Sequence, residues 1–311
     1  MPQRMAGSTD DKLLTSDEAF YFVQDVLGMS SIKLKDNPQE FLKDLIRTYL
    51  HHIPFSNVQN LATPQHSRHV PTVSEIKRDI FTKIGGMCYQ HNVAVYLLLK
   101  ALGYDVSLIA CDIQHPSDHA AIIVHSLTNE GSRHYVDVGN GTPLFSVVPF
   151  DFKDESPPYH HSFLRFKFSR QGDIIYCLHQ VEGHPAKQTM EANRITDGWY
   201  RFITMHFKEG VAISHFEPSM TPIYVGCSDT PKSVFLTSVR CMAFPNGRFV
   251  CIKDTTFLIE NEPGKITKSY FRSLEEIKRA FAQYFPQVSQ EMLDVALNDE
   301  FITLDYKKGI L

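Results

Sequence analysis

The 311-residue sequence lacks an excess of positive charge, because 31 Lys and Arg residues face 35 Asp and Glu residues, a formal net charge of −4 at pH 7. Such a chain has no basic field of the kind that attracts phosphate backbones or anionic membranes, so nucleic acid is not an expected partner. The chain also lacks an uninterrupted apolar run of about 18 residues, which argues against a membrane-spanning helix. Residues 1–15 contain no continuous apolar segment typical of a signal peptide. We therefore expect a cytoplasmic protein.

Metal-ligand spacing is also missing. The six cysteines are scattered, with no C-x-x-C pair among them, which disfavours a zinc site and a dense disulfide framework. We expect no metal, and free thiols in a reducing compartment. What the chain does have is 43% hydrophobic and 21% charged residues, the composition of an ordinary globular protein with a sizeable core.

The first third of the chain has helical periodicity. Ser16 is expected to cap one helix, Asn37-Pro38 places a cap and an N1 proline before a second, and a third begins near Ser74. The run from Cys88 to Leu102 has helical length and is followed by Gly103, a suitable C-terminal stop. Cys88 is therefore expected at a helix N-terminus.

The hydrophobic period changes near residue 105. Short β-rich runs separated by Gly, Pro, Asn and Ser clusters predict an antiparallel sheet curled into a barrel, with strands at 105–113, 119–126, 133–139, 162–169 and 173–181. Later come strand-like runs at 235–243 and 248–259, joined by a turn at 245–247, and a helix opened by the capping box Ser273-x-x-Glu276. The predicted fold class is α+β, with a helical domain (1–104), a β-barrel domain (105–214) and an α/β lid domain (215–311).

Cys88 lies in a context that suits a nucleophile. Cysteine attacks as the thiolate, which a helix N-terminus or an imidazolium stabilises. The preceding Gly85 and Gly86 allow a tight backbone turn and leave space beside the sulfur. On this segment alone, a small buried hydrophobic residue is an equally compatible interpretation.

A cysteine nucleophile needs a base and a group that orients the base. His119 opens an apolar β-run, and Asp137 lies inside the strand Tyr135–Gly139, where burial of a carboxylate is costly unless it is paired. If the two strands are neighbours, Asp137 accepts the His119 N–H and favours the imidazolium, which holds Cys88 as thiolate. A structural histidine and a turn-forming aspartate are the alternatives.

Four blocks, together with the run Thr230–Phe235, are similar to successive signatures of the arylamine N-acetyltransferase family. The blocks are Ile53-Pro54-Phe55-Ser56-Asn57, Gly85-Gly86-Met87-Cys88-Tyr89-Gln90-His91-Asn92, His119-Ala120-Ala121-Ile122-Ile123-Val124 and Tyr135-Val136-Asp137-Val138-Gly139. They occur in the family's order, and the similarity covers nearly the whole chain after about Ser16. The resemblance implies a helical bundle, a β-barrel and an α/β lid around a cysteine-protease-like core.

The resemblance also implies a ping-pong acyltransferase. Cys88 would take an acetyl group from acetyl-CoA and pass it to the nitrogen of an arylamine, arylhydrazine or similar amine, with His119 and Asp137 completing the catalytic triad. By position in the family, further residues are expected to contact CoA (His115, Pro116, Lys232) or the acceptor (Ser117, Asp118, Asn140).

Two departures from the family pattern keep other interpretations open. Ile84 stands where the family usually has Arg, and Asn140 stands where it usually has Phe. The first alternative is a transglutaminase-like or peptidase-like enzyme with the same order of Cys, His and Asp. The second is a catalytically silent family member that acts as a binding protein.

Overall fold

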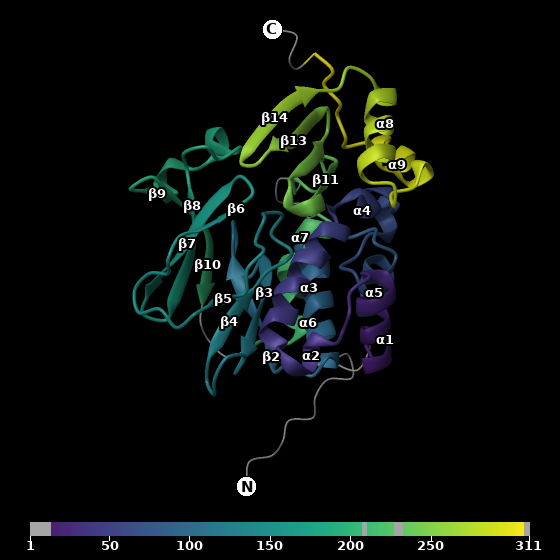
Figure 1. Ribbon diagram of the computed structural model, residues 1–311. Helices are drawn as coiled ribbons and strands as arrows, with labels where there is room; N and C mark the ends of the chain where they lie inside the picture. Colours follow the sequence, from purple (N-terminus) through teal and green to yellow (C-terminus); the bar gives the residue numbers. More distant parts are fainter. Residues whose placement is uncertain (1–13, 207–209, 227–232, 308–311) are drawn as a thin grey trace.

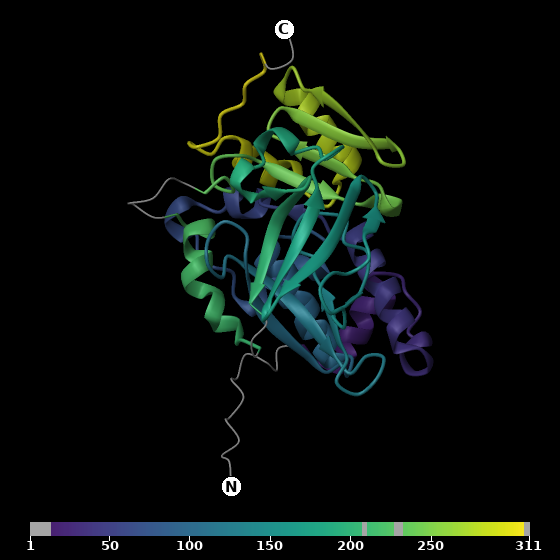
Figure 2. The ribbon, with the colours of Figure 1, turned by 90° about the vertical axis from the view of Figure 1, so that its left-hand side faces the viewer.

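The computed structural model describes residues 14–206, 210–226 and 233–307. Helices from the first third of the chain lie beside a large curled sheet, and a second, smaller sheet with two helices lies above both (Figure 1). Figure 2 shows the large sheet with the helix of residues 217–224 along one side. The predicted α+β class with a curled antiparallel sheet is confirmed, although the sheet is open, as a half-barrel.

The helical part follows the predicted pattern with one shifted cap. Thr15, not Ser16, caps the first helix, because its side chain accepts the Glu18 N–H while Glu18 accepts the Thr15 N–H. Asn37 caps the third helix as predicted, through Glu40 N. The elements are α1 (Ser16–Tyr21), the π-helical turn η2 (Phe22–Val26), α2 (Lys33–Asp36), α3 (Pro38–His52), α4 (Val58–Ala62), η3 (Gln65–Ser67), α5 (Val73–Phe81) and α6 (Cys88–Ala101).

The large sheet has the order β5-β4-β3-β2-β10-β8-β7-β6, with β9 beside β10. The sequence did not predict β10. Its pairing with β8 has a register shift between Arg201 and Ile203, which interrupts the alternation of inward and outward side chains. The strands are β2 (Val106–Asp112), β3 (His119–His125), β4 (Arg133–Val136), β5 (Val148–Pro149), β6 (Tyr159–His161), β7 (Leu164–Gln171), β8 (Ile174–Gln180), β9 (Ile195–Thr196) and β10 (Trp199–His206), with short 3-10 turns η4 (Lys187–Thr189) and η5 (Ala192–Arg194).

The second sheet combines an early strand with four late ones, in the order β1-β11-β12-β13-β14. The predicted strand at 248–259 is divided in two at Asp254, whose φ of 51° turns the chain back on itself. Ser273 caps α8 through Glu276 N, but the Glu276 carboxylate accepts from Arg272 N and not from Ser273. The elements are β1 (Phe55–Ser56), η6 (Ile213–Phe216), α7 (Glu217–Tyr224), β11 (Arg240–Ala243), η7 (Pro245–Gly247), β12 (Val250–Lys253), β13 (Thr256–Glu262), β14 (Lys265–Tyr270), α8 (Leu274–Tyr284) and α9 (Gln290–Leu297).

Helix α6 is the centre of the main core. From Cys88 to Leu99 every residue except Ala94 is buried. The second half of the helix is apolar on most sides, and the polar side chains of its first turn, Gln90, His91 and Asn92, have hydrogen-bond partners in the protein.

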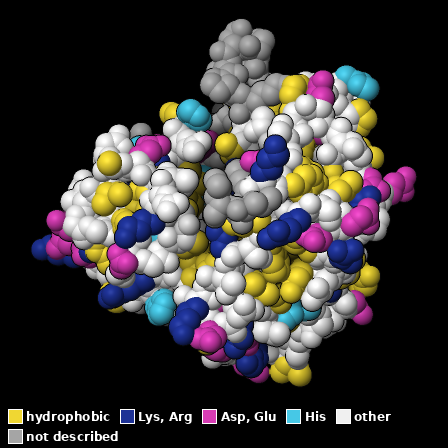
Figure 3. Space-filling model, turned by 90° about the horizontal axis from the view of Figure 1, so that it is seen from above, with side chains coloured by type: hydrophobic (Ala, Val, Ile, Leu, Met, Phe, Trp, Pro, Cys, Tyr) yellow, Lys and Arg dark blue, Asp and Glu magenta, His cyan; other side chains and the backbone are white. Residues whose placement is uncertain are grey.

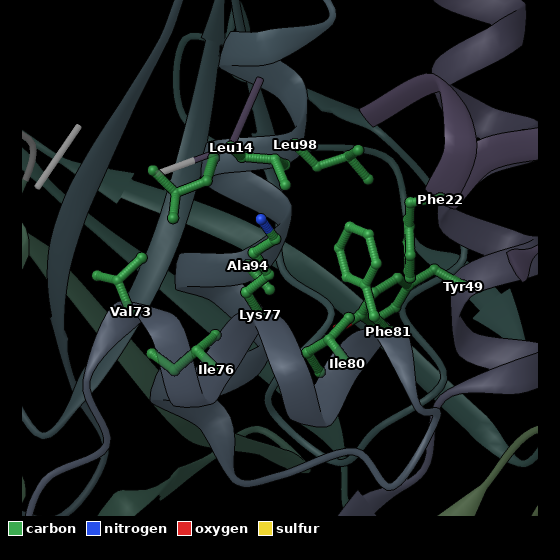
Figure 4. A pocket seen from close by; sticks show the side chains of 11 residues that line it. Leu14, Phe22, Tyr49, Val73, Ile76, Lys77, Ile80, Phe81, Ala94 and Leu98 are labelled. Carbon is green, nitrogen blue, oxygen red and sulfur yellow. The ribbon is translucent and has the colours of Figure 1, made fainter. Parts of the chain in front are cut away.

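Figure 4 shows a small apolar cavity beside α6. Its two lining residues with polar tips have protein partners, because Lys77 pairs with Glu18 and the Tyr49 hydroxyl lies 2.9 Å from His91 Nδ1. The cavity lies among Leu14 and the elements η2, α3, α5 and α6, and its lining is almost wholly apolar, so it is a packing gap of the helical part.

The boundaries near 104 and 214 remain our proposal for the domain division. Contacts of β1 with β11 and of α4 with α9 join the first and third units closely. Basic and acidic side chains are interspersed on the face seen in Figure 3. Within the part of the chain that the structure describes, no helix is long and apolar enough to cross a membrane.

Candidate active site

Cys88 is the first residue of α6, and the loop before it is held by hydrogen bonds to α6 and to β1. The Gln90 side chain accepts from Met87 N at 3.0 Å, and Ser56 N donates to Gly86 O at 2.8 Å. Gly85 has a φ of +82°, and a Cβ there would lie 1.8 Å from Pro54 O, so glycine is required for both conformation and space. The thiol therefore lies where the free N–H groups of the helix favour negative charge.

The pairing of β3 with β4 brings His119 and Asp137 together, so the condition that their strands be neighbours is met. The predicted strand at 133–139 ends earlier, at Val136, so Asp137 directly follows β4 and does not lie inside it. Nε2 of His119 lies 2.8 Å from Oδ2 of Asp137, and both side chains are fully buried. Nδ1 of His119 is also buried and has no oxygen or nitrogen partner among the described residues. Cys88 interacts with this ring, so the unpaired nitrogen is the atom left for the thiol.

The Asp137 carboxylate is held by four further donors. Oδ1 accepts from Asn92 Nδ2 at 2.9 Å and from Gly139 N at 3.0 Å. Oδ2 accepts from Tyr135 Oη at 2.8 Å and from Asn140 Nδ2 at 3.0 Å. With His119 the carboxylate has five donors, so its burial as an anion is fully compensated.

Burial and pairing act in opposite directions on the two charges. Burial tends to lower the pKa of His119, but the Asp137 carboxylate outweighs burial and raises this pKa above its usual range, with a further contribution from Cys88. Burial tends to raise the pKa of Asp137, but His119, Asn92 and Gly139 together hold it below its usual range. The pair is therefore an imidazolium and a carboxylate at neutral pH.

The loop from Ile113 to Asp118 lies next to the sulfur. The Asp118 carboxylate accepts from the backbone N–H groups of Ile113, Gln114 and His115, at 2.7, 2.9 and 2.9 Å. The Asp118 carbonyl oxygen lies 4.0 Å from Cys88 Sγ. The carboxylate of Asp118 thus shapes the loop, while its backbone faces the thiol.

Ser117 connects this loop to the third unit. It has a φ of 57°, its N–H donates to Asp112 at 2.8 Å, and its carbonyl accepts from Ser219 Oγ at 2.6 Å. Its hydroxyl lies 3.4 Å from His215 Nε2. His115 and Pro116 line a cleft together with Asp112, Glu191, Arg194 and Arg201.

The remaining predicted residues are placed differently. Both polar ends of the Asn140 amide are occupied, by Asp137 and by Thr142. Lys232 lies outside the described residues. Among the residues that the structure describes, no group of three His, Cys, Asp or Glu side chains is arranged to hold a metal ion.

Three residues of the site were not predicted. Asn92 lies one helical turn after Cys88, a spacing that places both on one face of α6, and donates to Asp137 and to Ala120 O. Tyr135 precedes Asp137 by two residues, so period-two alternation places both side chains on one face. The Gln90 side-chain oxygen accepts a hydrogen bond from Tyr224 Oη at 3.0 Å. This contact joins α6 to α7, and no local pattern in the sequence predicts it.

The fold is shared with arylamine N-acetyltransferases of known structure. It matches the enzyme from Mycobacterium abscessus with a TM-score of 0.72 and 16% identity, over 96% of this chain and 99% of that one. It matches the enzyme from Mycobacterium marinum, solved in complex with CoA, with a TM-score of 0.69 and 15% identity, over 90% of this chain and 98% of that one. At such identities the likeness establishes the fold alone.

The sequence itself establishes the family. An N-acetyltransferase family model matches residues 39–292. A curated relative, the arylamine N-acetyltransferase pineal gland isozyme NAT-10 of Gallus gallus, is 27% identical over 123 residues, which cover 38% of this chain and 42% of that relative. The chain belongs to the arylamine N-acetyltransferase family, whose members are enzymes.

Proposed function

We propose that this protein transfers an acetyl group from acetyl-CoA to the nitrogen of an arylamine, arylhydrazine or similar amine, through a thioester on Cys88. The observation that carries the proposal is the convergence of the Cys88 thiol, the His119 ring and the Asp137 carboxylate at the N-terminus of α6. A buried imidazolium beside a cysteine is the arrangement that stabilises a thiolate nucleophile.

The chemistry takes two half-reactions. In the first, the Cys88 thiolate attacks the thioester carbonyl, the bond to the CoA sulfur breaks, and the CoA thiolate takes the proton from His119. In the second, the amine nitrogen attacks the acetyl-Cys88 carbonyl and gives its proton to His119, while the Cys88 thiolate leaves. The products are CoA thiol and an amide, and the imidazolium and thiolate are restored.

The cleft beside His115 and Pro116 is our candidate for the acyl donor. Arg194 and Arg201 line this cleft together with Asp112 and Glu191. The Arg194 guanidinium already donates to Ile113 O and Phe202 O, so Arg201 is the proposed contact for the anionic phosphates of CoA. The same loop ends at Asp118, next to the sulfur, so a donor extended along it reaches Cys88. Lys232 remains a proposed CoA contact on the family resemblance.

For the acceptor, Ser117 is the proposed polar contact: its exposed hydroxyl has one long hydrogen bond, 3.4 Å to His215 Nε2, which a ligand could replace. The Asp118 carboxylate and the Asn140 amide are occupied by protein partners, so we propose that they shape the acceptor region without a direct polar contact. The free thiols among the described cysteines are consistent with the proposed cytoplasmic location.

A matrix of acyl-CoA thioesters against amines and hydrazines, followed by release of free CoA, tests the proposal. Turnover with acetyl-CoA and an aromatic amine, lost in Cys88→Ala and kept in Cys251→Ala, supports it. Cys251 is a buried thiol of β12 in the second sheet and serves as the matched control. Release of ammonia or peptide fragments from a protein substrate, without dependence on CoA, favours a transglutaminase or peptidase. Binding of CoA without turnover favours a silent binding protein.

A further inference from the structure

Asn140 stands between the carboxylate of Asp137 and the turn that follows. Its Nδ2 donates to Asp137 Oδ2 at 3.0 Å. Its Oδ1 accepts from the backbone N and from Oγ1 of Thr142, at 2.8 and 2.6 Å. Because the Thr142 N–H can only donate, the amide oxygen must face Thr142 and the amide nitrogen must face Asp137. The network therefore fixes the orientation of the amide.

The Asp137 oxygen that Asn140 reaches is the one that holds His119. Oδ2 accepts from His119, Tyr135 and Asn140, three donors on an atom with two lone pairs. A donor on a carboxylate favours its charged form and withdraws negative charge from its other partners. Each donor on Oδ2 thus weakens the hold of this oxygen on the imidazolium.

We propose that Asn140 is a positioning residue of the candidate triad. Its amide donates to the same Asp137 oxygen as His119 and so limits how tightly His119 holds its proton. The catalytic consequence rests on the proposed function. In the amine half-reaction His119 must be neutral to accept a proton, and an unshared Asp137 would keep it protonated to higher pH. Asn140 would thus set the pH at which the acyl-enzyme becomes competent.

Few other groups titrate near the pair. Cys88 contacts the ring, and alkylation blocks its thiol in the experiment below. The other titratable groups that act on Asp137 come from β2, β4, β8 and α6. They are neutral near pH 7, because burial raises the pKa of the thiols and the phenol and lowers that of the imidazole: Cys111, Tyr135, Cys177 and His91.

The test reads the proton on His119 directly and needs no acyl donor. Wild type, Asn140→Ala and Asn140→Asp are alkylated at Cys88 with iodoacetamide, and their labelled histidines are titrated by NMR, with His119 assigned by loss of its signal in His119→Gln. Asn261→Ala is the matched control, because it removes an exposed amide that donates to Thr267, far along the sequence in β13. Melting temperatures are measured in parallel.

Loss of the donor is expected to raise the His119 midpoint in Asn140→Ala by about one pH unit, a tenfold tighter hold on the proton. Asn140→Asp keeps an acceptor for Thr142 but adds a carboxylate beside Asp137, and is expected to raise the midpoint further. Asn261→Ala should leave it unchanged. If acyl transfer is present, the pH midpoint of the amine half-reaction moves in the same direction.

An unchanged midpoint in Asn140→Ala, with a lower melting temperature, would show that Asn140 only braces the turn at Thr142 and would overturn the inference. If Asn140→Asp does not fold, the alanine variant still decides the question. Failure of the proposed function appears separately, as absence of CoA release by the wild type while the His119 midpoints still differ between the variants.

Discussion

Nε2 of His119 lies 2.8 Å from Oδ2 of Asp137, and neither side chain is exposed to solvent. A buried ion pair is stabilising only when its lone pairs and protons are satisfied. Here the carboxylate has five donors, while Nδ1 of His119 remains without an oxygen or nitrogen partner in the described structure. The imidazole is thus fixed on one side and available to Cys88 on the other.

Selective alkylation of Cys88 is the first expected outcome. Burial raises the pKa of the thiols of Cys111, Cys177, Cys241 and Cys251, so these thiols resist ionisation at neutral pH. Cys88 lies at a helix N-terminus beside an imidazolium and should react with iodoacetamide first at pH 7. Peptide mapping after brief labelling checks this. Labelling spread evenly over the cysteines, or favouring Cys227 or Cys241, would contradict the assignment of the nucleophile.

Asp137→Asn is expected to preserve the fold and to abolish most of the acyl transfer. The amide has nearly the same volume, but it does not stabilise an imidazolium, and it favours the wrong orientation of the His119 hydrogen bond. A comparable change in the triad of a serine protease costs about 10⁴-fold in turnover. An unchanged circular dichroism spectrum with turnover near the wild-type rate would make Asp137 a structural residue only.

The pair also predicts a pH dependence of stability. The pKa of His119 is raised to about 10 in the folded protein, above its value of about 6.5 in the unfolded chain. The stabilisation is therefore complete below about pH 6.5 and is lost as the pH rises toward about 10. The Cys88→Ala variant removes the thiol, so its ionisation no longer contributes to the difference in bound protons between the folded and unfolded states. In this variant the free energy of unfolding should fall by up to about 1.4 kcal/mol per pH unit between pH 7 and 9.

Cys88→Ala/Asp137→Asn is the matched variant for that measurement. Without the Asp137 carboxylate the pKa of His119 is no longer raised. The free energy of unfolding of the double variant should therefore change much less between pH 7 and 9. Urea denaturation at several pH values gives both slopes. Equal slopes in the two variants would mean that Asp137 does not hold the proton on His119.

Gly139 should not tolerate a side chain. A Cβ there would lie 2.6 Å from Cys88 O and 2.7 Å from Asn92 Nδ2, so Gly139→Ala must displace the start of α6 or the support of Asp137. We expect a loss of about 1–3 kcal/mol in stability together with a loss of acyl transfer. Gly183→Ala, at φ +76° with open space around it, is the control and should cost stability without reducing acyl transfer. Retained activity in Gly139→Ala would show that the contact between α6 and the segment after β4 is not tight.

Local signals in the sequence predicted most of the elements. The Asn37 cap, the stop at Gly103 and the β-rich apolar runs of β2 and β3 are short-range patterns, and each corresponds to an element that the structure shows. The prediction failed where a distant contact decides the structure. The pairing of β1 with β11 joins residues far apart in the chain, and β10 is interrupted by a bulge.

The same division applies to the site. Cys88, His119 and Asp137 each have a local reason for their residue type, and the sequence suggested all three before the structure placed them together. The spacing of Asn92 from Cys88 and of Tyr135 from Asp137 places the two side chains of each pair on one face. Neither was predicted, because both donate to the Asp137 carboxylate, for which the sequence had already suggested His119 as partner. The opposite roles of the two ends of the Asn140 amide depend on the turn at Thr142, which the sequence does not specify.

The central claim is that acetyl is carried on Cys88. Purified protein incubated with acetyl-CoA and no amine, then quenched in acid and analysed by intact mass and peptide mapping, tests it most directly. The account predicts a mass increase of one acetyl group, located on the peptide that contains Cys88, absent in Cys88→Ala and discharged on addition of an aromatic amine. An unmodified Cys88 in protein that consumes acetyl-CoA, or acetyl located on another residue, would contradict it.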